Sequence, residues 1–316
     1  MTTATDVTVL GASGGIGNAI VVELAARGHA VTAVNRTGDA VVPDGVVRRA
    51  GDLRDPAAAT DAVGGADVIV MAAQPPYPEW VVGFPTLVDN VLAGAEAVGA
   101  RLVFVDNLYM YAPAEGPLTE QSPEHATDPK GTLRRRLGET LLATHAAGRV
   151  RVSVGRFSDY YGPGGTNSGL YHLAIAPGLR GRTMRGLADL DQPHTFHFLP
   201  DAARGFATLL EDDRADGQVW LLPSAPPITQ RQLLELLAAE LPRRVRVGRV
   251  TPAMLRLAGL ANPMVRETRS TVVQWDRPWV VDATRFTSAF GEIDTTPHDV
   301  AMARTIAWFR ENHSTS

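Results

Sequence analysis

Short apolar runs alternate with amphipathic segments along the first part of the chain. Val7–Leu10 is a continuous apolar run that ends at a cluster of glycines. In the segment that follows, Ile16, Ile20 and Leu24 recur every four residues, which is typical of one face of a helix. A second apolar run, Val31–Val34, comes next. This succession predicts a strand, a glycine turn, a helix and a second strand, which together form the βαβ unit.

The same alternation continues to residue 155. It predicts further strands at Val46–Arg49, Asp67–Ala72, Arg101–Asp106 and Arg151–Gly155, and helices at Pro56–Val63, Phe84–Val98 and Thr132–Ala146. Continuously apolar strands between amphipathic helices are typical of a parallel sheet that is covered on both faces. We therefore predict an α/β fold with a doubly wound parallel sheet of the Rossmann type.

After Phe157 the alternation weakens. Gly162–Gly169 is rich in glycine and predicts an irregular loop, and two later helices are predicted at Gln230–Leu241 and Thr296–Asn312. We expect residues 1–160 to form the Rossmann domain, with strand or helix returns from about 195–222. Residues 161–316 are expected to form mainly a smaller C-terminal α/β region, packed against the carboxyl edge of the sheet.

Composition removes several classes of protein from consideration. A net charge of −4 and a pI near 6.1 provide no field that would recruit nucleic acid or an anionic membrane. The arginines of Arg243–Arg249 alternate with valines, which is typical of a half-exposed strand. The absence of cysteine excludes disulfides, thiolate catalysis and Cys-ligated zinc. No signal peptide and no apolar window of the ~20 residues that a membrane span needs is recognised, so a cytoplasmic protein is expected.

A glycine-rich turn, Gly11–Gly17, follows the first predicted strand and has the spacing G-x-x-G-x-x-G. Glycine lets the backbone turn sharply and approach a pyrophosphate, and the N–H groups that open the next helix then face the phosphates. The alternative is a turn without a ligand, but the position between a strand and a helix favours a dinucleotide site. The residues expected at this site are Gly11, Ser13, Gly14, Gly15, Ile16 and Gly17.

The end of the second predicted strand, Asn35-Arg36, bears on the choice of dinucleotide. An NAD enzyme usually carries an acid here, which accepts hydrogen bonds from the ribose 2′-hydroxyl. An arginine instead pairs with a 2′-phosphate in two-pronged fashion, and the Ser13 hydroxyl can add a donor to the same phosphate. We therefore expect NADP(H) rather than NAD, with Asn35 and Arg36 at the ribose; the alternative is that Arg36 is a solvated loop charge.

The chain resembles the extended short-chain dehydrogenase/reductase superfamily, of the NAD(P)-dependent epimerase/dehydratase type. The resemblance covers essentially the whole chain and rests on the glycine turn and on the segments Gly51–Leu53, Ala72-Ala73, Asn90, Arg156–Gly164, Phe198–Ala203, Asp282, Phe290-Gly291, Thr296-Pro297 and Trp308-Phe309. It implies an NAD(P)-binding Rossmann domain followed by a substrate-binding region. It also implies further cofactor contacts at Asp52, Leu53, Ala72, Ala73 and Gln74.

The catalytic positions of the family are altered in this chain. Asn107 stands where the family has a serine or threonine. The Tyr-x-x-x-Lys pair of the family, counted back from Glu139, falls on Gly131 and Arg135. Glycine cannot transfer a proton, and arginine does not exchange its proton near neutral pH. The resemblance still allows Arg135 to hold the nicotinamide ribose. Tyr109 is a candidate replacement for the proton donor, or a half-buried packing residue, so the expected catalytic residues are Asn107, Tyr109 and Arg135.

Aromatic and histidine side chains near the carboxyl edge of the sheet are candidates for contact with a substrate, although packing is an alternative role for each. These candidates are Tyr77, Trp80, Tyr111, Tyr171, His172 and His194. His194 and His197 are three residues apart, but no third ligand stands at convincing spacing, so we expect no metal.

The expected function is an NADP(H)-dependent oxidoreductase that transfers hydride between the cofactor and a small organic substrate such as a ketone, aldehyde, imine or activated alkene. Two alternatives stay open: an epimerase, isomerase or lyase that uses bound cofactor transiently, and a non-enzymatic redox sensor that binds NADP. The resemblance also implies a possible homodimer through Phe84–Val98 and Thr132–Ala146. No partner other than a small-molecule substrate is expected.

Overall fold

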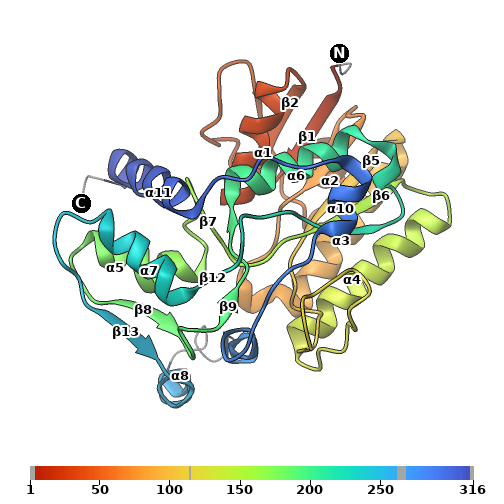
Figure 1. Ribbon diagram of the computed structural model, residues 1–316. Helices are drawn as coiled ribbons and strands as arrows, with labels where there is room; N and C mark the ends of the chain where they lie inside the picture. Colours follow the sequence, from red (N-terminus) through yellow and green to blue (C-terminus); the bar gives the residue numbers. More distant parts are fainter. Residues whose placement is uncertain (1–3, 114, 262–267, 314–316) are drawn as a thin grey trace.

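The centre of the molecule is a seven-stranded parallel sheet (Figure 1). The computed structural model describes residues 4–113, 115–261 and 268–313. The strands, in spatial order, are β3 (Val47–Ala50), β2 (Ala30–Asn35), β1 (Asp6–Leu10), β4 (Val68–Met71), β5 (Arg101–Asp106), β6 (Val152–Arg156) and β11 (Val219–Leu221). The order reverses between β1 and β4, and ligands of doubly wound sheets bind in the crevice at such a reversal. The Rossmann prediction is confirmed.

Two layers of helices cover the sheet. One face carries α2 (Pro56–Val63), α3 (Trp80–Val98) and α4 (Pro129–Ala146), which share one apolar cluster with the strands. The other face carries α1 (Gly15–Ala26), α6 (Leu199–Glu211) and α10 (Thr284–Phe290), which share a second cluster. Because the central strands are apolar on both faces, each layer of helices removes apolar surface from water, and this burial is the main driving force for the fold.

Helix α4 begins three residues earlier than its apolar spacing predicts. The Asp128 carboxylate accepts hydrogen bonds from the backbone N–H groups of Lys130 and Gly131, both at 3.1 Å. Pro129 occupies the first helical position, where its missing N–H costs nothing. This cap adds a turn that contains Lys130 and Gly131 to the helix, and it fixes which side chains of α4 face the sheet.

The stretch Tyr77–Val98, which consists of the 3₁₀ turn η1 (Tyr77–Glu79) and α3, differs from the expectation that no segment is apolar enough to span a membrane. By length and composition alone it is apolar enough to cross a membrane, with a mean hydropathy of 1.3. In the structure, however, Phe84, Val88 and Val91 are buried against the sheet. We therefore assign α3 to the core of the domain.

The second half of the chain builds a smaller region beside the sheet, on the left of Figure 1. Its apolar cluster joins α7 (Gln230–Ala239) and α11 (His298–His313) to the turn before α5 (Ala176–Leu179). The remaining elements of this part are η2 (Tyr171–Ile175), α8 (Pro252–Ala261), η4 (Thr268–Trp275) and three short strand pairs: β7 (Tyr160–Tyr161) with β10 (His197–Phe198), β9 (Pro193–His194) with β12 (Ile228–Thr229), and β8 (Met184–Leu187) with β13 (Val247–Val250). The turn η3 (Asp213–Ala215) belongs to the sheet domain, where it joins α6 to β11.

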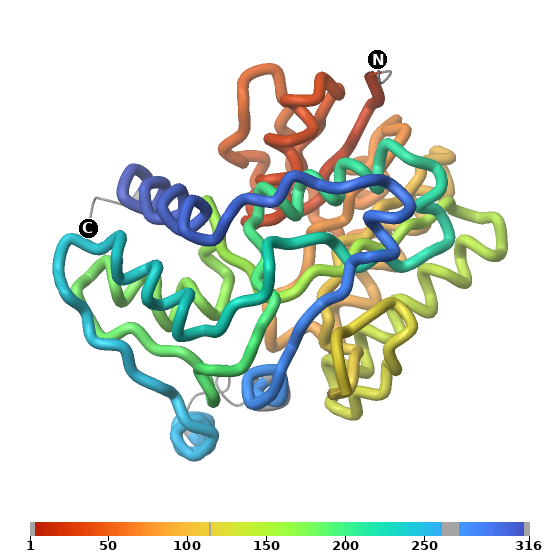
Figure 2. Tube along the Cα trace, viewed as in Figure 1, coloured from red at the N-terminus to blue at the C-terminus, as the bar shows by residue number. Residues whose placement is uncertain are grey.

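The chain returns to the first domain twice. The first return contributes α6 and β11. The second contributes α10: the tube in Figure 2 runs back across the sheet domain before α11 ends in the smaller region. Phe290 of α10 packs 4.7 Å from the ring of Trp220 in β11. The two regions are therefore interleaved in sequence.

Candidate functional site

The glycine turn is crowded at Gly11 and Gly15, where a side chain would meet the backbone of other segments. Gly11 has φ +91°, and a Cβ on it would lie 2.6 Å from the backbone nitrogen of Ala73. A Cβ on Gly15 would lie 3.0 Å from the carbonyl oxygen of Gly164. Helix α1 starts after Gly14 with no side chain capping its first N–H groups. The turn is thus a close-packed cradle, and the N–H groups at the start of α1, which no side chain caps, fit a pyrophosphate.

The expected contacts at the adenosine end lie around this cradle. Arg36 and Ser13 are exposed, whereas Leu53 is buried and its carbonyl accepts a hydrogen bond from the Asn90 amide at 2.9 Å. The hydrogen bonds of Arg54 hold the pKa of the Asp52 carboxyl at about 2, and the charge of Arg36 adds to this lowering. At this end of the site, the exposed Arg36 guanidinium, near the ionised Asp52 carboxylate, is therefore accessible to a ligand.

Asn35 has a local structural role. Its side-chain oxygen accepts the N–H of Gly38 at 2.6 Å, and its amide donates to Asp39 at 2.8 Å. Thr37 also donates to Asp39, and these two hydrogen bonds lower the pKa of the Asp39 carboxyl, with Thr37 the larger cause. These contacts order the loop that carries Arg36.

A buried ionic network joins the carboxyl ends of three neighbouring strands. Asp106, at the end of β5, accepts from the Arg134 guanidinium at 3.0 Å and from Arg156 at 3.1 Å. Arg134 also donates to the side-chain oxygen of Gln74, just beyond β4, at 3.1 Å. Arg156, at the end of β6, donates to Glu124 at 2.6 Å. Burial lowers the pKa of Arg134, and the Asp106 charge opposes that shift.

Helix α4 presents a different pair of residues to this edge than the sequence alone predicts. Lys130 and Arg134, four residues apart, are both buried. A Cβ on Gly131 would lie 2.5 Å from the carbonyl oxygen of Tyr109, so no larger side chain fits there. Arg135 lies on the outer face, where it pairs with Glu139 at 2.9 Å. The expected position of Arg135 at the ribose is corrected: the arginine that reaches the sheet edge is Arg134.

Arg135 instead borders an open hollow of about 730 Å³. The other residues that line it are Glu124, His125, Ala126, Thr127, Thr132 and Glu139. This hollow lies on the far side of α4 from Lys130 and Arg134. One of its lining residues, Glu124, also accepts the hydrogen bond from Arg156 at the end of β6.

Three aromatic rings stand over the same edge. The ring centroid of Trp80 lies 4.9 Å from that of Tyr77 and 5.9 Å from that of Tyr109. The Arg134 guanidinium lies 4.3 Å from the Trp80 ring, and the Lys130 ammonium lies 4.1 Å from the Tyr77 ring. Trp80 is buried and donates to the Pro75 carbonyl, so it packs in the core, while Tyr77 and Tyr109 keep part of their surface exposed.

The pKa of Tyr109 is unfavourable for proton exchange near neutral pH. Burial is the main cause that raises its pKa well above the ordinary value, and Tyr77 and Asp159 raise it further. Its phenol therefore stays protonated over the neutral range, although one side of the residue remains accessible. The Asn107 side-chain oxygen accepts the backbone N–H of Tyr109 at 3.1 Å, so Asn107 shapes this turn.

The other substrate candidates are placed in three different settings. Tyr111 is buried and its hydroxyl accepts from Arg156 at 2.8 Å. Tyr171 stacks on Phe309 at 5.0 Å, while His172 is exposed. These three residues do not form one wall with Tyr77 and Trp80. Of the set, Tyr77 is the candidate that lies beside Lys130 at the sheet edge.

His194 is buried and acts on a neighbouring carboxylate. Its ring stacks on Trp275 with 4.1 Å between centroids, and its Nε2 lies 3.0 Å from an oxygen of Asp159. Asp159 keeps 29% of its side chain exposed, against 2% for His194. The group that this pair presents to a ligand is therefore the Asp159 carboxylate, which also influences Tyr109.

His197 is a neutral structural residue. Its Nδ1 accepts the N–H of Ser158 at 3.1 Å, and its Nε2 lies 3.0 Å from the carbonyl of Leu222, to which it donates. Burial lowers its pKa to about 4. Among the described residues, no group of three or more acidic, histidine or cysteine side chains could hold a metal ion.

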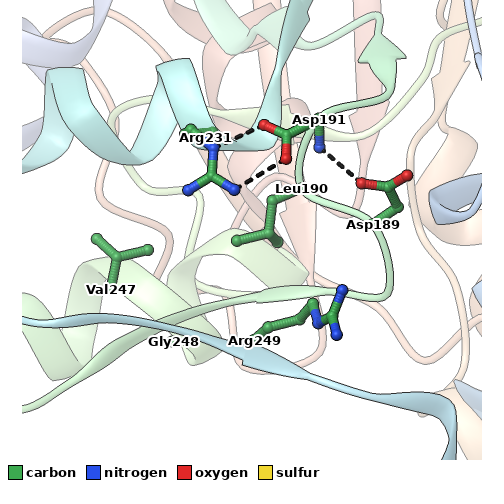
Figure 3. A pocket seen from close by; sticks show the side chains of 7 residues that line it. All are labelled: Asp189, Leu190, Asp191, Arg231, Val247, Gly248 and Arg249. Atoms are coloured by element: carbon green, nitrogen blue, oxygen red, sulfur yellow. Dashed lines mark hydrogen bonds and ion pairs between the residues drawn. The ribbon is translucent and has the colours of Figure 1, made fainter.

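A second hollow, of about 250 Å³, lies in the C-terminal region (Figure 3). Arg231 donates two hydrogen bonds, of 2.6 and 2.8 Å, to the Asp191 carboxylate. Asp189 accepts the N–H of Asp191 at 3.0 Å, and Arg249 stands across the hollow. Because its acids and arginines offset one another, this hollow offers no strong charge to a ligand and is not our candidate site.

Sequence reasoning missed four residues that organise the candidate site: the buried Asp106, Lys130 and Arg134, and the partly exposed Asp159. The sequence did contain one signal for Lys130 and Arg134. An Asp-Pro dipeptide predicts a helix start, and in a helix that starts there Lys130 and Arg134 lie i, i+4 on one face. Nothing in the sequence marks Asp106 or Asp159, whose partners are 28 and 35 residues away along the chain.

Comparison with known proteins agrees with this geometry. Solved structures with the same fold include the dTDP-glucose 4,6-dehydratase DesIV of Streptomyces venezuelae, bound to NAD, at 20% identity and a TM-score of 0.79 over 98% of both chains. They also include WbmH of Bordetella bronchiseptica with NAD+, at 19% identity and a TM-score of 0.74 over 97% of this chain and 99% of that one. MoeE5, in complex with UDP-glucose and NAD, is 22% identical with a TM-score of 0.78 over 98% and 99%.

The sequence itself matches the NAD dependent epimerase/dehydratase family over residues 7–222. A search of curated protein sequences gives no match. The matched segment runs from β1 to the end of β11, so it contains the glycine cradle, the buried network and the face of α4. The chain belongs to the NAD dependent epimerase/dehydratase family, and its cofactor class is a nicotinamide dinucleotide.

Proposed function

We propose that the protein is an NADP(H)-dependent oxidoreductase that transfers hydride between the cofactor and a small organic substrate in the cytoplasm. The observation that carries the proposal is the contact of the glycine turn with Ala73, which brings the pyrophosphate cradle to the ends of β4 and β5. There the polar groups of Gln74, Asp106 and Arg134 converge, with the Arg134 guanidinium against the Trp80 ring. When bound, the cofactor supplies the hydride, and the protein supplies orientation and charge.

The choice of NADP(H) depends on Arg36. It is an exposed guanidinium directly after β2, near the ionised Asp52, and no acid occupies the residue that follows this strand. A guanidinium is suited to a 2′-phosphate, which would add two negative charges at neutral pH. The solved relatives named above carry NAD, so the preference for NADP(H) needs a direct test.

The test is a fluorescence titration of the purified chain with NADPH and with NADH. We expect NADPH to bind more tightly, by about tenfold or more, because one charge-assisted pair is worth ~1.5–3 kcal/mol. Arg36→Ala should remove most of that preference and leave the affinity for NADH unchanged. Arg54→Ala is the matched control, since Arg54 is also exposed but pairs with Asp52. Tighter binding of NADH by the wild-type chain would reject the NADP(H) assignment.

A second candidate function is an epimerase or dehydratase that uses bound cofactor transiently. It is favoured by the family of the chain and by the nucleotide sugars named with two of the solved relatives. Incubation with dTDP-glucose or UDP-glucose separates the two. A sugar product without net loss of cofactor would support the second candidate, whereas stoichiometric consumption of NADPH with a carbonyl panel would support the first. Binding without turnover of any substrate would instead favour a redox sensor.

A further inference from the structure

The face of α4 that is directed at the sheet carries a lysine and an arginine. Lys130 is 2% exposed and Arg134 is 3% exposed. Residues at i and i+4 of a helix lie above one another, which is also the spacing of the Tyr-x-x-x-Lys pair of the wider superfamily. A count from Glu139 places that pair at Gly131 and Arg135, whereas the two cations that face the sheet each lie one residue earlier. At the counted position Gly131 packs against the Tyr109 backbone.

Arg134 has hydrogen-bonding capacity left over at this edge. Its two terminal nitrogens donate to Asp106 and Gln74. Its Nε is buried and has no hydrogen-bond partner within the described part of the chain. Native proteins rarely leave a buried donor unpaired, and such a donor calls for an explanation by a ligand or a water molecule. Gln74, which accepts from a terminal nitrogen of Arg134, follows directly after Ala73, which touches the glycine turn, so the Arg134 guanidinium lies at the cofactor crevice.

Lys130 places a second cation beside Arg134. Its ammonium lies over the ring of Tyr77, in the loop that follows β4. Lysine ammonium groups and tyrosine phenols in general lose their protons in the same range, at about 10.4 and 10 respectively. A lysine can therefore replace a tyrosine as a proton donor, whereas an arginine cannot. Tyr109, the other candidate donor at this edge, has its pKa raised well above the ordinary value by burial.

We infer that Lys130 and Arg134 together replace the tyrosine and lysine of the superfamily: Lys130 transfers the proton at the substrate oxygen, and Arg134 orients the nicotinamide half of the cofactor. The inference rests on the proposed oxidoreductase function. In the reduction of a carbonyl, a C–H bond forms at the carbonyl carbon as the C=O π pair moves to oxygen. The Lys130 ammonium gives that oxygen a proton and regains one from water, so one carbonyl and one reduced cofactor become one alcohol and one oxidised cofactor.

Cofactor binding alone tests this pair before any substrate is known. The probes are NADPH, NADP+ and adenosine 2′,5′-bisphosphate, which has the adenosine half but no nicotinamide (ADP takes its place if NADH binds more tightly). Arg134→Lys keeps the charge but has no Nε donor. We expect it to weaken NADPH binding about tenfold and to leave binding of the bisphosphate unchanged, because one donor to the nicotinamide half is lost.

Lys130→Met tests whether the charge of the Lys130 ammonium acts on the nicotinamide ring. The oxidised nicotinamide ring is positive and the reduced ring is neutral, so a nearby ammonium disfavours NADP+ relative to NADPH. Lys130→Met should therefore lower the ratio of the NADP+ and NADPH dissociation constants about fivefold. Arg135→Gln, on the outer face of the same helix, and Tyr109→Phe, which removes the competing hydroxyl, should leave that ratio at its wild-type value.

The outcomes distinguish a failure of the proposed oxidoreductase function from a failure of the roles assigned to Lys130 and Arg134. If the wild-type chain binds no nicotinamide dinucleotide, the proposed function fails and the inference fails with it. If it binds NADPH, but Lys130→Met keeps the wild-type ratio and a folded Arg134→Lys binds NADPH normally, the inference alone is overturned. A shift of the ratio in Tyr109→Phe but not in Lys130→Met would overturn the inference in favour of Tyr109.

Discussion

At the scale of single residues, burial determines what each candidate side chain can do. It keeps the Tyr109 phenol protonated, and it converts His194 from a possible ligand contact into a support for Asp159. Neither effect is visible in the sequence, because both depend on neighbours that are distant along the chain. The residues that the sequence did identify correctly as close-packed are the glycines, since Gly11 and Gly15 have steric requirements that a motif records.

His197 makes a prediction about stability at this scale. Its pKa falls from 6.5 to about 4 on folding, so between those values the unfolded chain binds a proton that the folded chain does not. Stability is therefore full above pH 6.5 and is lost as the pH falls toward 4. At pH 5 the loss from this residue is about 2 kcal/mol.

Urea unfolding at pH 7.5 and at pH 5 measures the effect. His197→Gln can still accept from Ser158 and donate to Leu222 but cannot titrate, so it should lose less stability over the same range than the wild type. Equal losses in the two proteins would contradict the assignment of a buried, neutral His197. Because the comparison is between two proteins over one pH range, the titration of all other groups cancels.

At the scale of elements, the pattern of apolar residues predicted β1 to β6 and the helices α1 to α4, α7 and α11, but local chemistry set the ends. The buried strands β1, β4, β5 and β6 were recovered because a buried parallel strand is a short continuous apolar run. Helix α4 was predicted to start at Thr132, whereas the Asp128 cap and Pro129 start it three residues earlier. That turn carries Lys130, so the missed cap and the missed site residue have the same cause.

The cap of α4 makes a prediction at this scale. Asp128→Ala removes the acceptor for two backbone N–H groups and should destabilise the chain by about 1 kcal/mol, the typical value of a lost N-cap. Asp128→Asn keeps a side-chain oxygen in place and should lose less than half of that. Chemical denaturation at pH 7.5 measures both variants. An Asp128→Ala protein as stable as the wild type would show that the cap contributes nothing.

At the scale of the whole molecule, the sheet domain is completed by chain from far downstream. On one face α1 is joined by α6 and α10, and the seventh strand is β11; α6, α10 and β11 all follow residue 160. The sequence predicted the first return near 195–222 because that stretch resembles a family element. It did not predict α10, because the seven residues from Thr284 to Phe290 form a helix only one or two turns long.

This interleaving predicts that residues 1–160 do not fold alone. A fragment of that length would expose the sides of β5 and α1 that α6 covers, including Val103, at a cost of about 25 cal/mol for each Å² of apolar surface left in water. We expect the fragment to aggregate or to give a poorly dispersed NMR spectrum, and the full chain to unfold in one cooperative step. A well-dispersed spectrum from the fragment would show that the first domain is independent.

The contact between Gly131 and the Tyr109 backbone also limits how the protein can be engineered. Introducing a tyrosine at residue 131 would not restore the ordinary catalytic pair, because its first side-chain carbon already meets a carbonyl oxygen at 2.5 Å. Restoration would have to begin at Lys130 and Arg134, with Asp106 and Gln74 adjusted to a shorter cation. A change of catalytic type in this protein would therefore require a coordinated redesign of four positions: Lys130, Arg134, Asp106 and Gln74.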